Sequence, residues 1–349
     1  MGCLRLESYL TLVTQSDSAF NCSSMKHISI LVPNEAVLAS IIDPRTMFTG
    51  VNDFLELAQK PPMFKVQLVG LTKEVHLHGG LFTVHTDALL NEVKKTDLVL
   101  IPALSGNMSK ALELNKEFVP WIVRQYNKGA EVASLCIGSF LLASTGLLNG
   151  KECSSHWLSA PEFRDMFPDV KLVDGRVVTE QQGLYSSGGA TSYWNMLLHL
   201  VEKYAGREMA IQASKVYALE IDRKTQSPFM VFNGQKKHHD EPIKKAQEYI
   251  ESNISDRISV EDLALKYAIG RRHFERRFKK ATNNTPVEYI QRVKIEAAKK
   301  SLENSGKNVN EVMYDVGYSD TKAFRTVFKK LTGLSPIEYR NKYNKEAAL

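Results

Sequence analysis

The sequence has 349 residues, of which 43% are hydrophobic and 24% are charged, and its formal net charge is +6 at pH 7. These values are those of an ordinary soluble globular protein with room for two or three domains. The positive charge is uneven: residues 241–349 hold 22 Lys and Arg against 15 Asp and Glu, whereas residues 1–240 carry a net charge of −1. The last third therefore either binds a negatively charged partner or carries a solvated basic surface.

The cysteines exclude two classes of protein. Cys3, Cys22, Cys136 and Cys153 have no metal-ligand spacing and are too few for a disulfide scaffold. The sequence therefore predicts no metal site, no cofactor and a reducing, cytoplasmic environment. The uncharged run between Glu131 and Lys151 contains glycines and polar residues, so we expect a strand, a turn and a helix there rather than a membrane span.

Residues 1–24 lack the cationic start, the long apolar core and the cleavage site of a secretory signal. They also lack the myristoylation pattern. We expect a disordered leader, or a start codon upstream of the native one, and a first domain that begins at Met25.

Strand and helix patterns alternate over the first 220 residues. Short β-rich apolar runs occupy residues 28–32, 66–71, 97–102 and 131–135. Helical patterns lie between them, at 87–93 behind a capping Asp87 and at 108–129 before a stop at Gly129. This alternation predicts a doubly wound, flavodoxin-like α/β domain with a mostly parallel sheet.

Cys136 directly follows the last of these strands, in "VASLCIGSFLLASTG". Ligands of doubly wound sheets bind outside the carboxyl ends of the strands, so we expect Cys136 to be exposed to a pocket there. Gly138 and Ser139 would relieve crowding in the turn. A following helix N-terminus would favour the thiolate and lower the pKa of the thiol.

The segments "SLCIGSFLLASTGLLNGKECSSHW" and "FPDVKLVDGRVVTEQQGLYSSGGATSYWNMLLHLVEKYAG" carry a family resemblance. They resemble the class I glutamine-amidotransferase-like, PfpI-type domain, in the GlxA-like version that is fused to AraC-type regulators. The resemblance covers about residues 25–222 and implies a sensor domain over that range.

This sequence departs from the catalytic members of that superfamily at two positions. They carry His straight after the cysteine, where this chain has Ile137, and a carboxylate where the match of Pro44 places Ser40. A thiol needs an adjacent base to be an efficient nucleophile. The resemblance offers His156 alone as such a base, and a lone His beside Trp157 is more often structural. We therefore predict no enzymatic activity and a degenerate nucleophile position in an effector pocket. The predicted pocket residues are Ser40, Asp43, Pro44, Cys136, Ile137, Gly138 and His156.

The composition changes again after the α/β pattern ends. Residues 223–241 lose periodicity and gather Pro, Gly, Lys and His, which predicts a linker. Beyond it, "SVEDLALKYA" and "RRHFERRFKKAT" form helix, turn and basic helix. "VNEVMYDV" and "TKAFRTVFKKLTG" repeat this pattern about fifty residues later, across one long helix at 286–301. Two such units predict a pair of helix-turn-helix motifs in an all-α domain.

The segment "GYSDTKAFRTVFKKLTGLSPIEYR" resembles the most diagnostic part of the AraC/XylS DNA-binding domain. The resemblance implies a DNA-binding domain at 242–341, followed by a tail at 342–349. Phe274, Phe278, Phe324 and Phe328 recur at helical spacing and should be core. The predicted DNA-contacting residues are Arg271, Arg272, Glu275, Arg276, Lys279, Thr321, Lys322, Arg325, Thr326 and Lys329. We expect more base-specific contacts from the first motif, because Thr326 occupies in the second motif the position that Arg276 occupies in the first.

The sequence thus predicts a transcription regulator, most simply an activator, that binds double-stranded DNA and a small-molecule effector. Its expected partners include RNA polymerase and a second copy of the chain, through the N-terminal domain, and we expect it at the nucleoid with no membrane contact. Two alternatives stay open. One is a cysteine-dependent hydrolase or hydratase with an appended DNA-binding module, and the other is a dimerisation scaffold whose pocket is filled by its own side chains.

Overall fold

The computed structural model of the protein describes residues 25–221, 223–236 and 238–344. The predicted leader and residues 345–349 of the predicted tail lie outside these ranges. The chain divides into two compact units, Met1–Gln226 and Ser227–Leu349, which we call the N-terminal unit and the C-terminal unit. Each is described by itself.

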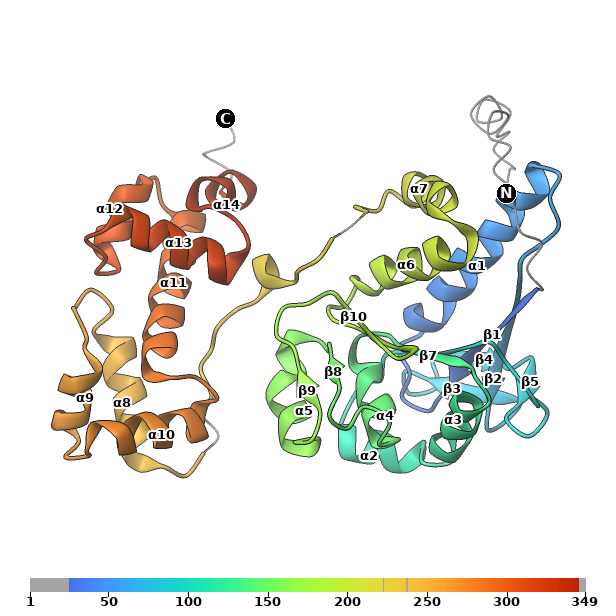
Figure 1. The fold of residues 1–349 in the computed structure, drawn as a ribbon, viewed down its shortest axis with the longest axis horizontal. Coiled ribbons are helices and arrows are strands. Elements are labelled where there is room, and N and C mark those ends of the chain that lie inside the picture. The colour runs from blue at the N-terminus through green and yellow to red at the C-terminus, as the bar shows by residue number, and fades with distance from the viewer. Residues whose placement is uncertain (1–24, 222, 237, 345–349) are drawn as a thin grey trace. The chain divides into compact units, whose positions relative to one another are not determined.

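A seven-stranded sheet forms the centre of the N-terminal unit (Figure 1). In sheet order its strands are β10 (Val178–Gln181), β11 (Leu184–Ser187), β7 (Glu131–Ser134), β6 (Leu98–Ile101), β1 (Lys26–Val32), β2 (Phe64–Gly70) and β5 (Ala88–Leu89). All neighbouring pairs are parallel except β10 and β11. Two small pairs lie outside this sheet: β3 (Glu74–Leu77) with β4 (Phe82–His85), and β8 (Glu152–Cys153) with β9 (Lys171–Leu172).

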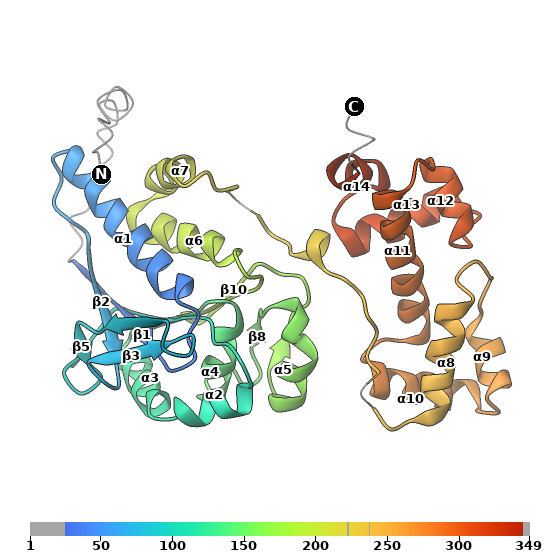
Figure 2. The ribbon, with the colours of Figure 1, turned by 180° about the vertical axis from the view of Figure 1, so that it is seen from behind.

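Helices cover both faces of the sheet, as Figure 2 shows. One hydrophobic core packs α1 (Ala39–Leu57), α6 (Tyr193–Ala205) and α7 (Arg207–Val216) against one face. The other core packs α2 (Met108–Leu114), α3 (Phe118–Asn127), α4 (Ser139–Ser144) and α5 (Ala160–Met166) against the opposite face. Because helices bury both faces, the central strand β6 is apolar throughout, and all four of its residues are buried. The predicted doubly wound fold is confirmed.

The helix predicted at residues 87–93 is wrong. Asp87 does not cap a helix there; its carboxylate accepts a hydrogen bond from the Leu68 backbone N at 2.7 Å and pairs with Arg45 at 2.8 Å. Ala88 and Leu89 then pair with the end of β2. Contacts to a strand about twenty residues earlier thus replace the local helical pattern.

The helical pattern at 108–129 forms two helices instead of one. The break falls at Asn115, whose side-chain amide exchanges two hydrogen bonds of 2.8 Å with the backbone of Asn34. The buried amide thus supplies hydrogen-bond partners for the backbone of the loop after β1. The next helix, α3, begins three residues after Asn115.

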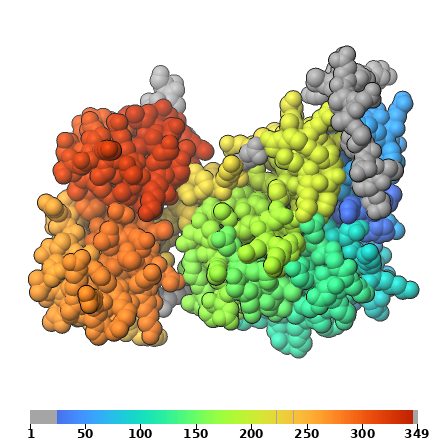
Figure 3. Space-filling view, in the orientation of Figure 1, coloured from blue at the N-terminus to red at the C-terminus, as the bar shows by residue number. Residues whose placement is uncertain are grey.

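Between Glu241 and Asn344, the described part of the C-terminal unit has only helices as regular structure. Its helices are α8 (Glu241–Ser252), α9 (Val260–Lys266), α10 (Arg271–Thr282), α11 (Pro286–Asn304), α12 (Val309–Asp315), α13 (Thr321–Thr332) and α14 (Pro336–Tyr343). One core joins α8, α9, α10 and the start of α11, and a second joins the end of α11 to α12, α13 and α14. In Figure 3 the two parts appear as an orange lobe and a red lobe.

Side-chain caps define where these helices begin. Reciprocal capping boxes start α11, α12 and α14, from Thr285 with Glu288, Asn308 with Glu311, and Ser335 with Glu338. Ser259 also caps α9, because its Oγ accepts a hydrogen bond from the Asp262 backbone N at 3.0 Å. These local side-chain contacts set the helix starts.

Candidate DNA-binding surface and effector pocket

The predicted recognition helices are α10 and α13, each the second helix of a helix-turn-helix motif. Phe274 and Phe278 of α10 and Phe324 and Phe328 of α13 are fully buried. Their i, i+4 spacing fixes which face of each helix packs inward, so the residues between them face solvent. Both helices end in a left-handed residue, Asn283 in the first motif and Gly333 in the second.

Not every cation on α10 is equally available to a ligand. Arg271 pairs with Glu275 at 3.2 Å and with Glu261 at 3.4 Å. Arg277 makes a two-pronged contact with Asp240, at 2.9 and 2.7 Å. The carboxylate of Asp240 therefore holds Arg277 against the start of α8, on the side of α10 away from the exposed row.

The remaining predicted contact residues lie on the solvent side of the two helices. Arg272, Arg276, Lys279, Lys322, Arg325, Thr326 and Lys329 are exposed, and Glu275 and Thr321 are half-buried. Lys280 and Lys330 are exposed on the same helices. The arrangement presents guanidinium and ammonium groups on both recognition helices, the groups that bind phosphates and guanine edges.

The turn at Cys136 has the sharp geometry expected of its position. Cys136 has a φ of 53° and opens a short 3₁₀ helix, Cys136–Gly138, that leads into α4. A side chain at Gly138 would clash with the Pro102 carbonyl oxygen, so only glycine fits there. The Cys136 backbone N donates a hydrogen bond to Ser187 Oγ at 3.3 Å, which ties the turn to the end of β11.

We expected the Cys136 thiol to be exposed and its pKa to be lowered, and both predictions are wrong. The residue is only 4% exposed. Burial raises the pKa of this thiol to about 12, and the hydrogen bond from the Ile137 backbone only partly offsets it. A short 3₁₀ turn supplies too few aligned peptide dipoles to outweigh desolvation of a thiolate. At neutral pH Cys136 is a neutral thiol and a poor nucleophile.

Ser40, Asp43 and Pro44 all lie on α1, near its start. The buried Ser40 hydroxyl donates to the Val37 carbonyl oxygen at 2.6 Å and accepts from the Ala103 backbone N at 2.9 Å. Ser40 therefore joins α1 to the loop after β6. Pro44 is buried within the same helix.

Asp43 accepts a 2.6 Å hydrogen bond from the Oη of Tyr193, and Tyr193 is the first residue of α6. Burial, and then the Asp43 contact, raise the pKa of Tyr193, and the thiol of Cys136 lies near enough to contribute to the same shift. Sequence analysis missed Tyr193. The tyrosine follows the "SSGGATS" segment and was visible only as part of a helical run, whereas its contact with Asp43 spans 150 residues.

Ile137 and His156 complete the predicted pocket. Ile137 packs partly buried against both cores of the N-terminal unit. His156 is half-buried, and its Nδ1 accepts a hydrogen bond from the Leu158 backbone N at 3.1 Å, which caps the 3₁₀ turn Trp157–Ser159. Burial lowers the pKa of His156, so the ring is neutral at pH 7. Its role within the described contacts is to cap a turn.

A pocket of about 290 Å³ lies elsewhere in the N-terminal unit. It is lined by Arg176, Val178, Asn195, Leu198, His199, Glu202, Ile221, Arg223 and Lys224. None of these is a predicted effector residue. The pocket lies where α6 and the start of β10 meet the segment that leaves the unit.

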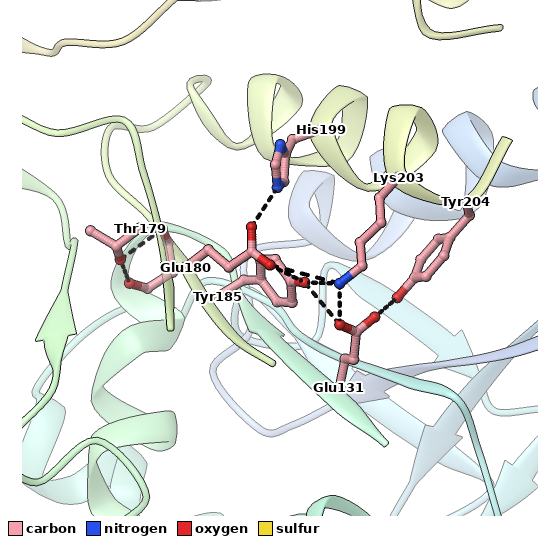
Figure 4. Close-up of polar contacts among 8 residues, drawn as sticks. Glu131, Thr179, Glu180, Tyr185, His199, Lys203 and Tyr204 are labelled. Atoms are coloured by element: carbon pink, nitrogen blue, oxygen red, sulfur yellow. Dashed lines mark hydrogen bonds and ion pairs between the residues drawn. The ribbon is translucent and has the colours of Figure 1, made fainter. Parts of the chain in front are cut away.

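A polar cluster lies at the other end of β7 from Cys136 (Figure 4). The Lys203 ammonium group of α6 lies between Glu131 and Glu180, 2.5 and 3.7 Å from their nearest carboxylate oxygens. Tyr185 Oη bonds to both carboxylates, and His199 contacts Glu180 at 3.0 Å. The hydrogen bonds from Lys203, Tyr204 and Tyr185 lower the pKa of Glu131 against the opposing effect of burial. The cluster joins α6 to the sheet and contains none of the predicted effector residues.

No helix in residues 25–221, 223–236 and 238–344 is long and apolar enough to cross a membrane. In the same ranges, no group of three or more His, Cys, Asp or Glu side chains is placed to hold a metal ion.

Comparison with known families matches both halves of the chain. Residues 50–203 match the DJ-1/PfpI family, and residues 263–342 match a helix-turn-helix domain. The chain also resembles a crystal structure of a candidate transcriptional regulator protein from Vibrio parahaemolyticus, with a TM-score of 0.50 and 22% identity over 55% of this chain and 99% of that one. This likeness concerns the fold alone.

Two named relatives match more than half of the chain, and a third matches a shorter part. The HTH-type transcriptional regulator GbdR of Pseudomonas aeruginosa is 26% identical over 279 residues, which cover 77% of this chain and 72% of that protein. GlxA of Rhizobium meliloti, another HTH-type transcriptional regulator, is 23% identical over 61% of this chain and 66% of its own length. The activator and DNA repair enzyme AdaA of Bacillus subtilis is 39% identical over 93 residues, 27% of this chain and 44% of its own. The chain therefore carries an N-terminal DJ-1/PfpI-type domain and a C-terminal AraC-type helix-turn-helix domain, and it is similar to HTH-type transcriptional regulators.

Proposed function

We propose that the protein is a sequence-specific DNA-binding transcription regulator, acting as an activator, whose N-terminal unit binds a small-molecule effector beside Cys136. The observation that carries the proposal is the pair of helix-turn-helix motifs on one continuous helix, α11, each with an exposed row of cations on its second helix. Two motifs on one helix suit successive major grooves on one face of DNA, roughly 10 base pairs apart. Some bending of the DNA would let both enter.

The proposal extends to partners. An activator contacts RNA polymerase at the promoter, and a second copy of the chain would join through the N-terminal unit. The protein would act in the cytoplasm at the nucleoid. The N-terminal unit would have no catalytic role, because the pKa of the Cys136 thiol is about 12 and Ser40 and His156 are both engaged in backbone hydrogen bonds.

The DNA-binding claim is tested by salt dependence. Genomic fragments selected by the full-length protein would be bound with an affinity that falls by orders of magnitude between about 50 and 200 mM salt, because several phosphate contacts release counterions. The variant pair Lys279→Gln and Lys329→Gln should make the plot of log affinity against log salt concentration less steep. The slope should fall by about one for each phosphate that the protein no longer neutralises. Lys215→Gln, the same charge change on α7, serves as the control and should leave the slope unchanged. Binding that is insensitive to salt would exclude the proposed interface.

The sensor claim is tested at the thiol. Cys136→Ser keeps the size and hydrogen bonding of the side chain while it removes thiolate chemistry, so this variant should retain effector-dependent transcription from a native target promoter. Cys136→Trp should abolish the response by filling the pocket. Cys153→Ser is a matched control, because Cys153 is also buried and its pKa is also raised to about 12. Loss of regulation in Cys136→Ser, with chemical conversion of the effector by the unmodified protein, would establish the enzyme alternative.

A further inference from the structure

The segment predicted as a linker, residues 223–241, has little regular structure, yet hydrogen bonds fix much of it. Apart from the 3₁₀ turn Ser227–Phe229, its described residues before Glu241 lie outside helices and ladder strands. The residues up to Gln226 are held by the N-terminal unit, and those from Pro228 onward by the C-terminal unit. We call residues 228–236 the strap.

Gln226 anchors the segment to the N-terminal unit. It is 2% exposed, and its Nε2 donates to the carbonyl oxygens of Ser155 at 3.2 Å and Arg176 at 2.7 Å. Its backbone N donates to the Gly175 carbonyl oxygen at 2.6 Å. A side chain at Gly188 would collide with Gln226 Nε2, so the Gln226 amide occupies the space that this glycine leaves.

This anchor contacts residues next to those that surround Cys136, at the proposed effector site. Gly188 directly follows Ser187, whose Oγ accepts the hydrogen bond from the Cys136 backbone N. Ser155, which receives the Gln226 amide, directly precedes His156, and its Oγ bonds to Ser139 of α4 at 2.8 Å. A ligand that shifts either of these segments would therefore move groups that hold Gln226.

The strap is anchored to α11 on the C-terminal side. The Phe232 backbone N donates to Glu296 Oε2 at 3.1 Å, and its ring packs edge-on against Tyr289 with the ring centres 5.1 Å apart. Lys299, whose side chain is 6% exposed, donates to the Met230 carbonyl oxygen at 2.6 Å and pairs with Glu296 at 2.8 Å. A buried ammonium group needs these partners, so loss of the strap would leave Lys299 under-satisfied.

The strap contacts both helix-turn-helix motifs. At its start, the Pro228 carbonyl oxygen accepts a hydrogen bond from Tyr343 of α14 at 3.3 Å. At its end, the Gln235 carbonyl oxygen accepts from Gln247 of α8 at 3.0 Å, and Gln235 Oε1 accepts from Asn284 at 3.1 Å. The strap therefore bridges the second motif to the first, alongside α11.

Only Ser227 separates the Gln226 anchor from the strap along the sequence. We infer that residues 226–236 couple the Cys136 pocket to the DNA-binding unit, with Gln226 as the anchor on the pocket side and Phe232 as the anchor on the DNA-binding side. Because only Ser227 lies between them, a displacement of Gln226 would shift the chain where the strap begins at Pro228, and so change how the strap holds the two motifs. This inference rests on the proposed function and names how it is regulated.

The coupling can be tested without knowledge of the effector, because coupling between two sites is reciprocal. If the pocket biases DNA binding, bound DNA must bias the pocket. The readout is the rate at which iodoacetamide alkylates Cys136 in the full-length protein, measured by mass spectrometry of the peptide that contains it. Because the thiol is buried, this rate reports the local opening equilibrium of the pocket. A selected genomic fragment should change the rate by at least about five-fold, the lower end of ordinary allosteric couplings.

Two variants test the route. In Gln226→Ala and in Phe232→Ala, the DNA-dependent change in the Cys136 alkylation rate should fall below about two-fold, because either substitution should remove the coupling. Val231→Ala is the control, because Val231 belongs to the same strap but is 42% exposed, and it should behave like the unmodified protein. The two variants act at opposite ends of the segment, so if Phe232→Ala does not fold, Gln226→Ala decides the question.

The outcomes separate this inference from the proposed function. Failure of the unmodified protein to bind any genomic fragment contradicts the proposed function. Binding without any DNA-dependent change in the Cys136 alkylation rate overturns the coupling alone. A DNA-dependent change that persists in Gln226→Ala overturns the route through residues 226–236.

Discussion

The two helix-turn-helix motifs share a scaffold and differ on their surfaces. The shared features are two buried phenylalanines in the recognition helix, a left-handed residue after it, a capping box on the next helix and a tyrosine that donates to a glutamate. In the first motif these are Phe274, Phe278, Asn283, Thr285 with Glu288, and Tyr289 to Glu251; in the second they are Phe324, Phe328, Gly333, Ser335 with Glu338, and Tyr339 to Glu303.

The solvent-facing positions of the two recognition helices have diverged. Glu275 corresponds to Arg325, and Arg276 to Thr326. Arg277, which pairs with Asp240, corresponds to Val327, which packs in the core of the second motif. Packing and capping thus preserve the fold of both motifs, while several exposed residues that would contact DNA differ and the lysine pairs Lys279–Lys280 and Lys329–Lys330 are shared. Three experiments test this division.

The largest expected effect is on the scaffold. Phe278→Ala and Phe328→Ala should each lower the free energy of unfolding of their own motif by about 3–5 kcal/mol, because each removes a fully buried ring and leaves a cavity. Hydrogen exchange of peptides from α8–α10 and from α12–α14 measures the two motifs separately. Equal acceleration in both motifs by either variant would show that they unfold as one body, and the comparison would then lose its basis.

A smaller effect is expected on DNA sequence preference. Arg276→Ala should lower discrimination by about 1–3 kcal/mol at one base pair, because Arg can bond two atoms of guanine. Thr326→Ala should cost less than about 1 kcal/mol, since a hydroxyl makes a weaker contact. Lys330→Ala is the control and should weaken binding to all sequences about equally. Competition assays with single-base variants of a bound fragment measure this, and an Arg276→Ala protein with unchanged preference at every position would contradict the assignment.

The smallest effect concerns pH. The hydrogen bond from Arg277 lowers the pKa of Asp240, so this pair stabilises the first motif above the unfolded pKa of about 3.9 and the stabilisation is lost as the pH falls through the lower, folded value. Its contribution should be about 1 kcal/mol, because both side chains are partly exposed.

Urea unfolding followed by NMR peaks of each motif, at about pH 7 and about pH 3, measures this difference. The capping carboxylates Glu288 and Glu338 have lowered pKa values in both motifs, so both should weaken in acid, and the first should weaken more. Arg277→Met should remove the additional loss of stability that the first motif shows in acid. If the two motifs lose equal stability in acid without any variant, Asp240 has no specific role.

The sequence predicted the C-terminal unit well because its signals are local. The i, i+4 phenylalanines lie within one or two helical turns, and the repeated helix–turn–helix pattern is visible as similar short segments about fifty residues apart. The alternation of strands and helices likewise predicted the doubly wound sheet of the N-terminal unit. These features depend on residues that are neighbours in the chain, and a sequence displays them directly.

Tertiary contacts decided what the sequence alone left open or predicted wrongly. Asp87 binds β2 instead of capping a helix, and burial of Cys136 raises a pKa that the following turn was expected to lower. The contact from Tyr193 to Asp43 spans 150 residues, and that from Lys299 to Met230, which fixes the strap, spans 69. Such contacts depend on which distant segments the fold brings together and on how much water it excludes, and no local pattern encodes either.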